Sequence, residues 1–234
     1  MSVWGKLAGL AAGYALGGVP GALVGGFLGH FVMDRLADRE VTFTIALIAL
    51  AAKMTRADGS VSPIEVRAVQ HVLRVPKSEM ANVDRVFRMA QGDVAGFDSY
   101  ARQIKELFAD KPETLEDVLD ALYFIAYADG VLHQAEEQFL DIVADIFEID
   151  KAKMAQIQAR HGGEGALNPY LILGVSDKDS DEVLRSAYYQ AVRDNHPDQL
   201  QARGMPPEML HVASARMAAI NEAWQLIKDA RKLS

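Results

Sequence analysis

The chain has 234 residues, half of them apolar, with a formal net charge of −8 and no cysteine. This length and apolar content allow one large or two small domains with buried cores and exclude a largely disordered chain. The acidic balance, with no basic cluster, excludes a general nucleic-acid binder, and the lack of cysteine excludes disulfides, thiolate metal sites and cysteine nucleophiles.

Residues 1–34 are expected to form a membrane anchor. No charged residue occurs from Leu7 to Gly29, and a tilted helix over residues 7–33, about 40 Å long, would cross a hydrocarbon core of about 30 Å. Its strongly apolar residues contribute about −3 to −6 kcal/mol to insertion, before the cost of its glycines and proline. The alternative is a glycine-rich hairpin that turns at "GGVPG", with arms too short to span a bilayer.

Glycine recurs at every fourth position of this segment. Such spacing lets two helix backbones approach closely in lipid, so it predicts a helix partner, and a second copy of the chain, forming a homodimer, is one candidate. Four residues turn a helix by about 400°, so each step moves the stripe about 40° around the axis and only some of the glycines face one partner. The members of the stripe are Gly9, Gly13, Gly17, Gly21, Gly25 and Gly29.

Basic residues indicate the orientation of the span. Arg35, Arg39, Lys53 and Arg56 follow it, whereas only Lys6 and the amino terminus precede it. Because the side richer in basic residues stays in the cytoplasm, we expect a single-pass protein with cytoplasmic C-terminal domains.

Residues 41–160 are expected to form a helical domain with an internal duplication. The pattern A-D-G-x-[VL]-x-x-x-E ends at Glu65 and again at Glu136, 71 residues later. Each copy predicts a helix, a tight turn at a glycine and a second helix. In the first copy, "SPIE" also predicts a capping box between Ser62 and Glu65.

This duplicated pattern resembles the TerB-like helical domain, a family associated with tellurite resistance and suspected metal binding. The resemblance implies that Asp58, Glu65, Asp129 and Glu136 are the acidic positions for a divalent metal. The alternative, which we prefer, is that these carboxylates cap helices.

Residues 168–234, after a linker at 161–167, are expected to form a helical hairpin. "NPYLILGV" predicts a short helix that ends at Gly174, and a second helix follows with the inward face Val183, Leu184, Ala187, Tyr188 and Ala191. The sequence His196-Pro197-Asp198 ends this helix, because proline cannot continue it. The long last helix has the predicted inward face Leu210, Met217, Ile220, Ala223 and Leu226.

The order "YLILGV", "LRSAY", H-P-D and "INEAW" resembles the DnaJ-type J domain. The resemblance implies docking on a DnaK-type heat-shock chaperone whose ATP hydrolysis is stimulated through His196, Pro197 and Asp198. The basic face that such domains present on the helix before H-P-D is thin here. It keeps Arg185 and Arg193 as partner-binding residues.

Taken in order, the three segments resemble the DjlA family of membrane-anchored co-chaperones, which implies an all-α protein of a bacterial inner membrane. The implied function is recruitment and stimulation of a DnaK-type chaperone, with no cofactor and no enzymatic activity of its own. The alternative is an acidic metal-responsive stress sensor in which the J domain is an accessory. The sequence contains no phosphate-binding glycine loop and no H-E-x-x-H motif, so it offers little support for an enzyme.

Overall fold

The computed structural model describes residues 35–57, 59, 62–73, 75, 77, 80–90, 96–162, 168–202 and 210–233. Every regular element in these ranges is a helix, which confirms the predicted all-α class for this part of the chain. The chain divides into two compact units, Met1–Ala109 and Asp110–Ser234.

The first unit is organised around its longest described helix. Its described helices are α2 (Arg35–Met54), α3 (Pro63–Val72), α4 (Met80–Ala90) and α5 (Phe97–Leu107). Helix α2 packs against α4 and α5, and nearly all of its side chains from Phe43 onward are buried. Phe43 also meets Phe108 edge to face, with ring centroids 5.2 Å apart, so the apolar second half of α2 is the core of this unit.

The two copies of the duplicated pattern have the same local geometry. Gly59 and Gly130 lie at φ +89° and +91°, in the left-handed region that favours glycine. In the helix after each turn, the third residue is a glutamate whose side chain accepts a hydrogen bond from the N-cap backbone. These bonds run from Ser62 to Glu65 at 2.7 Å and from His133 to Glu136 at 3.0 Å. The predicted helix, tight turn and capped helix are therefore confirmed in both copies.

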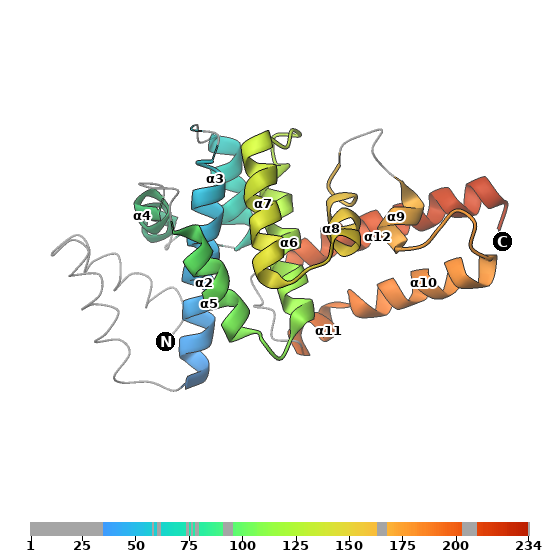
Figure 1. Cartoon of the computed structure of the whole chain (residues 1–234), viewed down its shortest axis with the longest axis horizontal. Coiled ribbons are helices and arrows are strands. Elements are labelled where there is room, and N and C mark those ends of the chain that lie inside the picture. Colours follow the sequence, from blue (N-terminus) through green and yellow to red (C-terminus); the bar gives the residue numbers. More distant parts are fainter. Residues whose placement is uncertain are drawn as a thin grey trace. The chain divides into compact units, whose positions relative to one another are not determined.

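The second unit contains the elements that carry the candidate site. Its described helices are α6 (Pro112–Ala126), α7 (Gln134–Phe147), α8 (Lys151–Gln158), α9 (Pro169–Leu173), α10 (Asp181–Asp194), α11 (Pro197–Ala202) and α12 (Leu210–Arg231). Helix α6 packs against α7, α8 and α12. Helices α10 and α12 run alongside each other, with the short α11 at one end of the pair (Figure 1).

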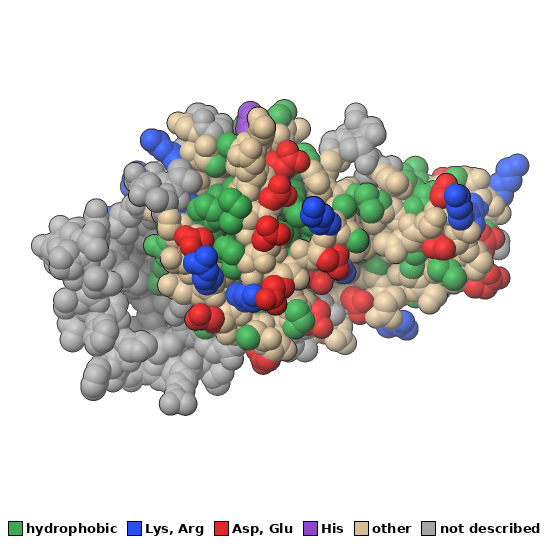
Figure 2. All heavy atoms as spheres, viewed as in Figure 1, with side chains coloured by type: hydrophobic (Ala, Val, Ile, Leu, Met, Phe, Trp, Pro, Cys, Tyr) green, Lys and Arg blue, Asp and Glu red, His purple; other side chains and the backbone are tan. Residues whose placement is uncertain are grey.

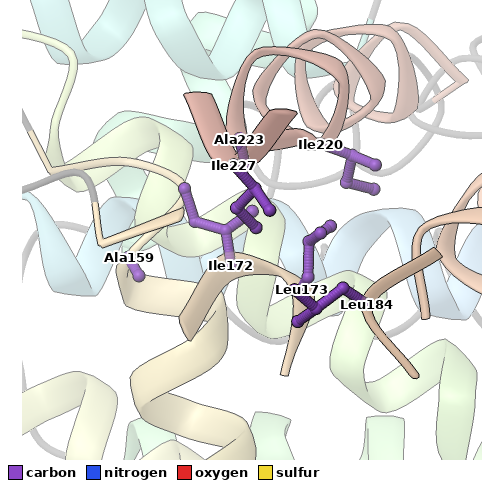
Figure 3. Packing of buried hydrophobic residues seen from close by; sticks show 7 residues of the cluster. All are labelled: Ala159, Ile172, Leu173, Leu184, Ile220, Ala223 and Ile227. Atoms are coloured by element: carbon purple, nitrogen blue, oxygen red, sulfur yellow. The ribbon is translucent and has the colours of Figure 1, made fainter. Parts of the chain in front are cut away.

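A small apolar core holds α9, α10 and α12 together and reaches the end of α8. Figure 3 shows its seven buried side chains converging from these elements: Ala159, Ile172, Leu173, Leu184, Ile220, Ala223 and Ile227. Gly174 ends α9 at φ +69°, as the sequence predicts.

The prediction of an inward-facing side chain is wrong for two residues, Val183 and Leu226. Val183 is 47% exposed and Leu226 is 41% exposed, whereas the adjacent Leu184 and Ile227 are fully buried. Seven residues return a helix to within about 20° of the same face, so Ile220 and Ile227 share a stripe. A spacing of six places Leu226 about 120° away from it.

Candidate partner-binding site

The His196-Pro197-Asp198 turn follows α10, includes the first two residues of α11 and presents two polar side chains to solvent. The side chains of His196 and Asp198 are 57% and 85% exposed. His196 caps α11: its carbonyl accepts hydrogen bonds from the N–H groups of Gln199 and Leu200 at 2.9 and 3.1 Å. Its Nδ1 accepts from the backbone N–H of Asp198 at 3.3 Å. The turn is therefore ordered by its own backbone while both side chains remain accessible to a partner.

Asn195, immediately before the turn, is buried and uses both ends of its side-chain amide. Its Nδ2 donates to the carbonyl of Ala191 at 2.7 Å, in the last turn of α10. Its Oδ1 accepts from Nη1 of Arg216 in α12 at 2.9 Å. The amide thus fixes the point at which the chain leaves α10 and enters the turn.

Arg216 is buried and ties this point to α6. Its Nη1 donates to Oδ1 of Asp117 at 2.5 Å, and its Nε and Nη2 donate to Oδ2 of Asp120 at 3.0 and 2.9 Å. The other oxygen of Asp120 contacts Arg160 at 3.4 Å and His161 at 3.1 Å. The three central side chains, those of Asp117, Asp120 and Arg216, are at most 5% exposed.

The charges of this buried network are mutually stabilised. Burial alone would raise the pKa of Asp120, but the positive charges of Arg216 and Arg160 and the hydrogen bond with His161 hold that pKa well below its usual range. Burial would lower the pKa of Arg216, and the carboxylates of Asp120 and Asp117 raise it above its usual value instead. The arrangement keeps both partners charged although both side chains are buried.

A partly open cavity of about 340 Å³ lies beside the network. Lys153 and Arg160 line it from the α8 side, and Gln190 and Asp194 line it from α10. Its walls therefore mix both charge signs and do not single out one class of ligand.

The two arginines predicted to contact a partner are both exposed on α10. Arg193 donates to Oε1 of Gln190 at 2.7 Å, and Arg185 borders a shallow depression together with Tyr189, which is 55% exposed. In Figure 2, basic side chains lie singly or in small groups among acidic ones over the described part of this face.

Four residues that support the turn from the interior were not predicted as site residues from the sequence: Asp117, Asp120, Asn195 and Arg216. The sequence does contain a pattern that indicates these residues, namely charged side chains on apolar helical faces. Arg216 precedes Ile220 by one helical turn and shares the stripe that continues to Ala223 and Ile227. Likewise, Asp120 interrupts the apolar run from Val118 to Ala126 in α6, and Asp117 lies three residues before it, near the same face of the helix. A charge on an apolar helical face indicates a buried pairing partner.

The described acidic positions of the duplicated pattern accept backbone hydrogen bonds near the start of the helix that follows each turn. Glu65 and Glu136 are buried as N-terminal caps. Asp129 accepts from the backbone N–H of Val131 at 3.0 Å, and Asp58 lies outside the described residues. No group of three or more His, Asp or Glu side chains able to hold a metal occurs among the described residues.

The anchor and its glycine stripe, residues 1–34 with Gly9, Gly13, Gly17, Gly21, Gly25 and Gly29, also lie outside the described residues. Within the ranges that the structure describes, no helix combines the length and apolar character required to cross a membrane.

Three family models match the chain, one after another. The model of the co-chaperone DjlA transmembrane domain matches residues 1–51, the model of the tellurite resistance protein TerB matches residues 44–159, and the DnaJ domain model matches residues 168–234.

Similar proteins extend over nearly the whole chain. The co-chaperone protein DjlA of Photorhabdus laumondii is 26% identical, over 97% of this chain and 98% of its own. The protein of the same name from Escherichia coli strain K12 is 24% identical over 98% of both chains. The one from Photobacterium profundum is 25% identical over 82% of this chain and 78% of its own. No solved structure matches the chain.

Proposed function

Because this chain has the three segments of the DjlA co-chaperones in their order and belongs with the DjlA-like proteins, we propose that it stimulates ATP hydrolysis by a DnaK-type chaperone. The observation that carries the proposal is the exposed pair His196 and Asp198, held on an ordered turn whose preceding residue is anchored in the interior. Such a turn offers one ring and one carboxylate to a partner at little ordering cost. Asp198 is suited to pairing with a basic group of the chaperone.

The test is an ATPase assay of a DnaK-type chaperone with the intact chain and with His196→Gln. The substitution keeps a polar side chain at a largely exposed position, so the fold and its stability should change by less than about 0.5 kcal/mol. We expect the variant to lose stimulation. The matched control is His71→Gln, an exposed histidine of α3 outside the second unit, which should stimulate like the unchanged chain. Equal stimulation by His196→Gln and the unchanged chain would refute the proposal.

We further propose that residues 1–34 hold the protein at the cytoplasmic face of a bacterial inner membrane. The support is the uncharged run of this segment, the basic residues that follow it and its match to the DjlA transmembrane domain. A membrane anchor raises the local concentration of the chaperone complex without any new contact. Deleting residues 1–34 should release the protein into the soluble fraction, and a truncated chain that still sediments with membranes would contradict the anchor.

Self-association through the glycine stripe is the third part of the proposal. Leucine at Gly17 and Gly21 would hold two backbones apart and weaken a dimer in the membrane, whereas ATPase stimulation should be unaffected. Crosslinking in membranes measures the first effect, and the assay above measures the second. A dimer population that does not change would show that these two glycines are not at the interface.

A further inference from the structure

The buried network of Asp117, Asp120 and Arg216 lies behind the turn and is linked to it through Asn195. We propose that Arg216 is a positioning residue for the His196-Pro197-Asp198 turn, and that Asp117 and Asp120 of α6 hold Arg216 in place. Helix α6 lies in the segment matched by the TerB model, and Arg216 lies in the segment matched by the DnaJ domain model. The TerB-like segment would then take part in stimulating the chaperone. This inference rests on the proposed function.

The first step is the geometry of the guanidinium. Two carboxylates of α6 accept from Nε, Nη1 and Nη2 of Arg216 at 2.5 to 3.0 Å. A planar guanidinium held from two sides by carboxylates has a fixed position and a fixed plane. A purely apolar contact between α6 and α12 would fix neither as closely.

The second step is the transfer of this position to the turn. Nη1 of Arg216 also donates to Oδ1 of Asn195, and the other end of that amide is bonded to the last turn of α10. His196 follows directly, and its own N–H donates to the carbonyl of Arg193 at 3.2 Å. The turn is thus fixed at its N-terminal side by α10 and by α12, and through α12 by α6.

The third step is energetic. Suppose that a partner binds only one arrangement of the turn. Its apparent affinity is then the intrinsic affinity multiplied by the fraction of molecules in which the turn has that arrangement. Holding Asn195 raises that fraction before the partner arrives. Loosening Asn195 should therefore raise the concentration of this chain that gives half-maximal stimulation of the chaperone's ATPase. The maximal stimulation should remain nearly unchanged.

Two variants of the full-length chain test this step. Asn195→Ala cuts the link between the turn and Arg216 and keeps both carboxylate pairs. The double variant Asp117→Leu with Arg216→Met removes one negative and one positive charge together, and Asp120 keeps Arg160 and His161 as partners. The matched control is Arg231→Gln. Arg231 also lies on α12 and pairs with an aspartate, Asp181, at 2.9 Å, but at the other end of α10.

Two quantities are measured for each variant: the half-maximal concentration in the ATPase assay, and hydrogen exchange of the backbone amides of Asp198, Gln199 and Leu200. For both test variants we expect the half-maximal concentration to rise about fivefold to tenfold and exchange at these amides to accelerate by a similar factor. The control should change neither quantity. Circular dichroism and thermal melting identify any variant that is not folded.

The inference is overturned if Asn195→Ala is folded and changes the half-maximal concentration by less than about twofold with unchanged amide exchange. If the double variant does not fold, Asn195→Ala alone decides. If His196→Gln stimulates normally, the proposed function fails, but accelerated exchange at the three amides would still show that Arg216 positions the turn.

Discussion

Arg216 donates from Nη1 to Oδ1 of Asn195 at 2.9 Å, and Asn195 directly precedes the exposed His196. Through this contact the buried charge network reaches Asn195, the residue next to the solvent-facing motif. An asparagine suits the position because it can accept from the arginine and donate to Ala191 in α10 at the same time. The exposed side chains of His196 and Asp198 make their contacts within the turn itself.

Asp120 should carry a large share of the stability of the second unit. Asp120→Asn keeps the shape of the side chain but leaves Arg160 and Arg216 with less negative charge in a buried site. Removing one member of such a network costs about 3–5 kcal/mol. Urea unfolding at pH 7 measures this difference, and Asp229→Asn on the exposed side of α12 should change stability by less than about 0.5 kcal/mol.

The pH dependence of that difference follows from the lowered pKa of Asp120. Its carboxylate faces Arg216 of α12, Arg160 and His161 after α8, and Asp117 of its own helix. A lowered folded-state pKa gives stability that is fully present above the unfolded value of about 3.9 and is lost as the pH falls below it, by up to about 1.4 kcal/mol per pH unit. The difference in the free energy of unfolding between the unchanged chain and Asp120→Asn should therefore become smaller as the pH falls from 4 to 2. A constant gap over that range would contradict the assignment.

The parts of the site that sequence could predict are those set by local patterns. The turn at His196, the capped turns at Gly59 and Gly130 and the end of α9 each depend on residues a few positions apart. Arg216, in contrast, pairs with Asp120 across 96 residues of sequence. No short-range rule selects that partner, because several aspartates could accept from the same guanidinium and only the tertiary fold brings one of them close.

The thin basic face of α10 should give a small and salt-sensitive contribution to partner binding. Replacing Arg185 and Arg193 together with alanine should raise the half-maximal concentration in the ATPase assay about threefold to tenfold at low salt, because exposed charges act mainly on the association rate. The effect should fade toward 1 M salt, where the screening length is about 3 Å. The control removes two other exposed charges, Lys178 and Lys232. A loss that is independent of salt would indicate direct contacts instead of steering.

Glu136 distinguishes helix capping from metal binding in the duplicated pattern. It accepts from the N–H of His133 at 3.0 Å as an N-terminal cap, so Glu136→Ala should cost about 1 kcal/mol and lower the melting temperature by about 2–4 °C. The exposed neighbour Glu137→Ala is the control. Capping also predicts that calcium, magnesium or zinc ions leave the melting temperature of the unchanged chain where it is. A metal that raises it, in a manner lost with Glu136→Ala, would favour the metal-responsive alternative.

The inward stripe of α12 should be sensitive to truncation only where the structure buries it. Ile220 is fully buried in the core with Leu184 and Ile172, so Ile220→Ala should destabilise the second unit by about 2–5 kcal/mol through lost apolar burial and a residual cavity. Leu226 lies on the same helix but is 41% exposed, and Leu226→Ala should cost less than about 1 kcal/mol. Chemical unfolding of both variants measures the contrast. Equal losses would mean that the helix is rotated so that Leu226 faces the core.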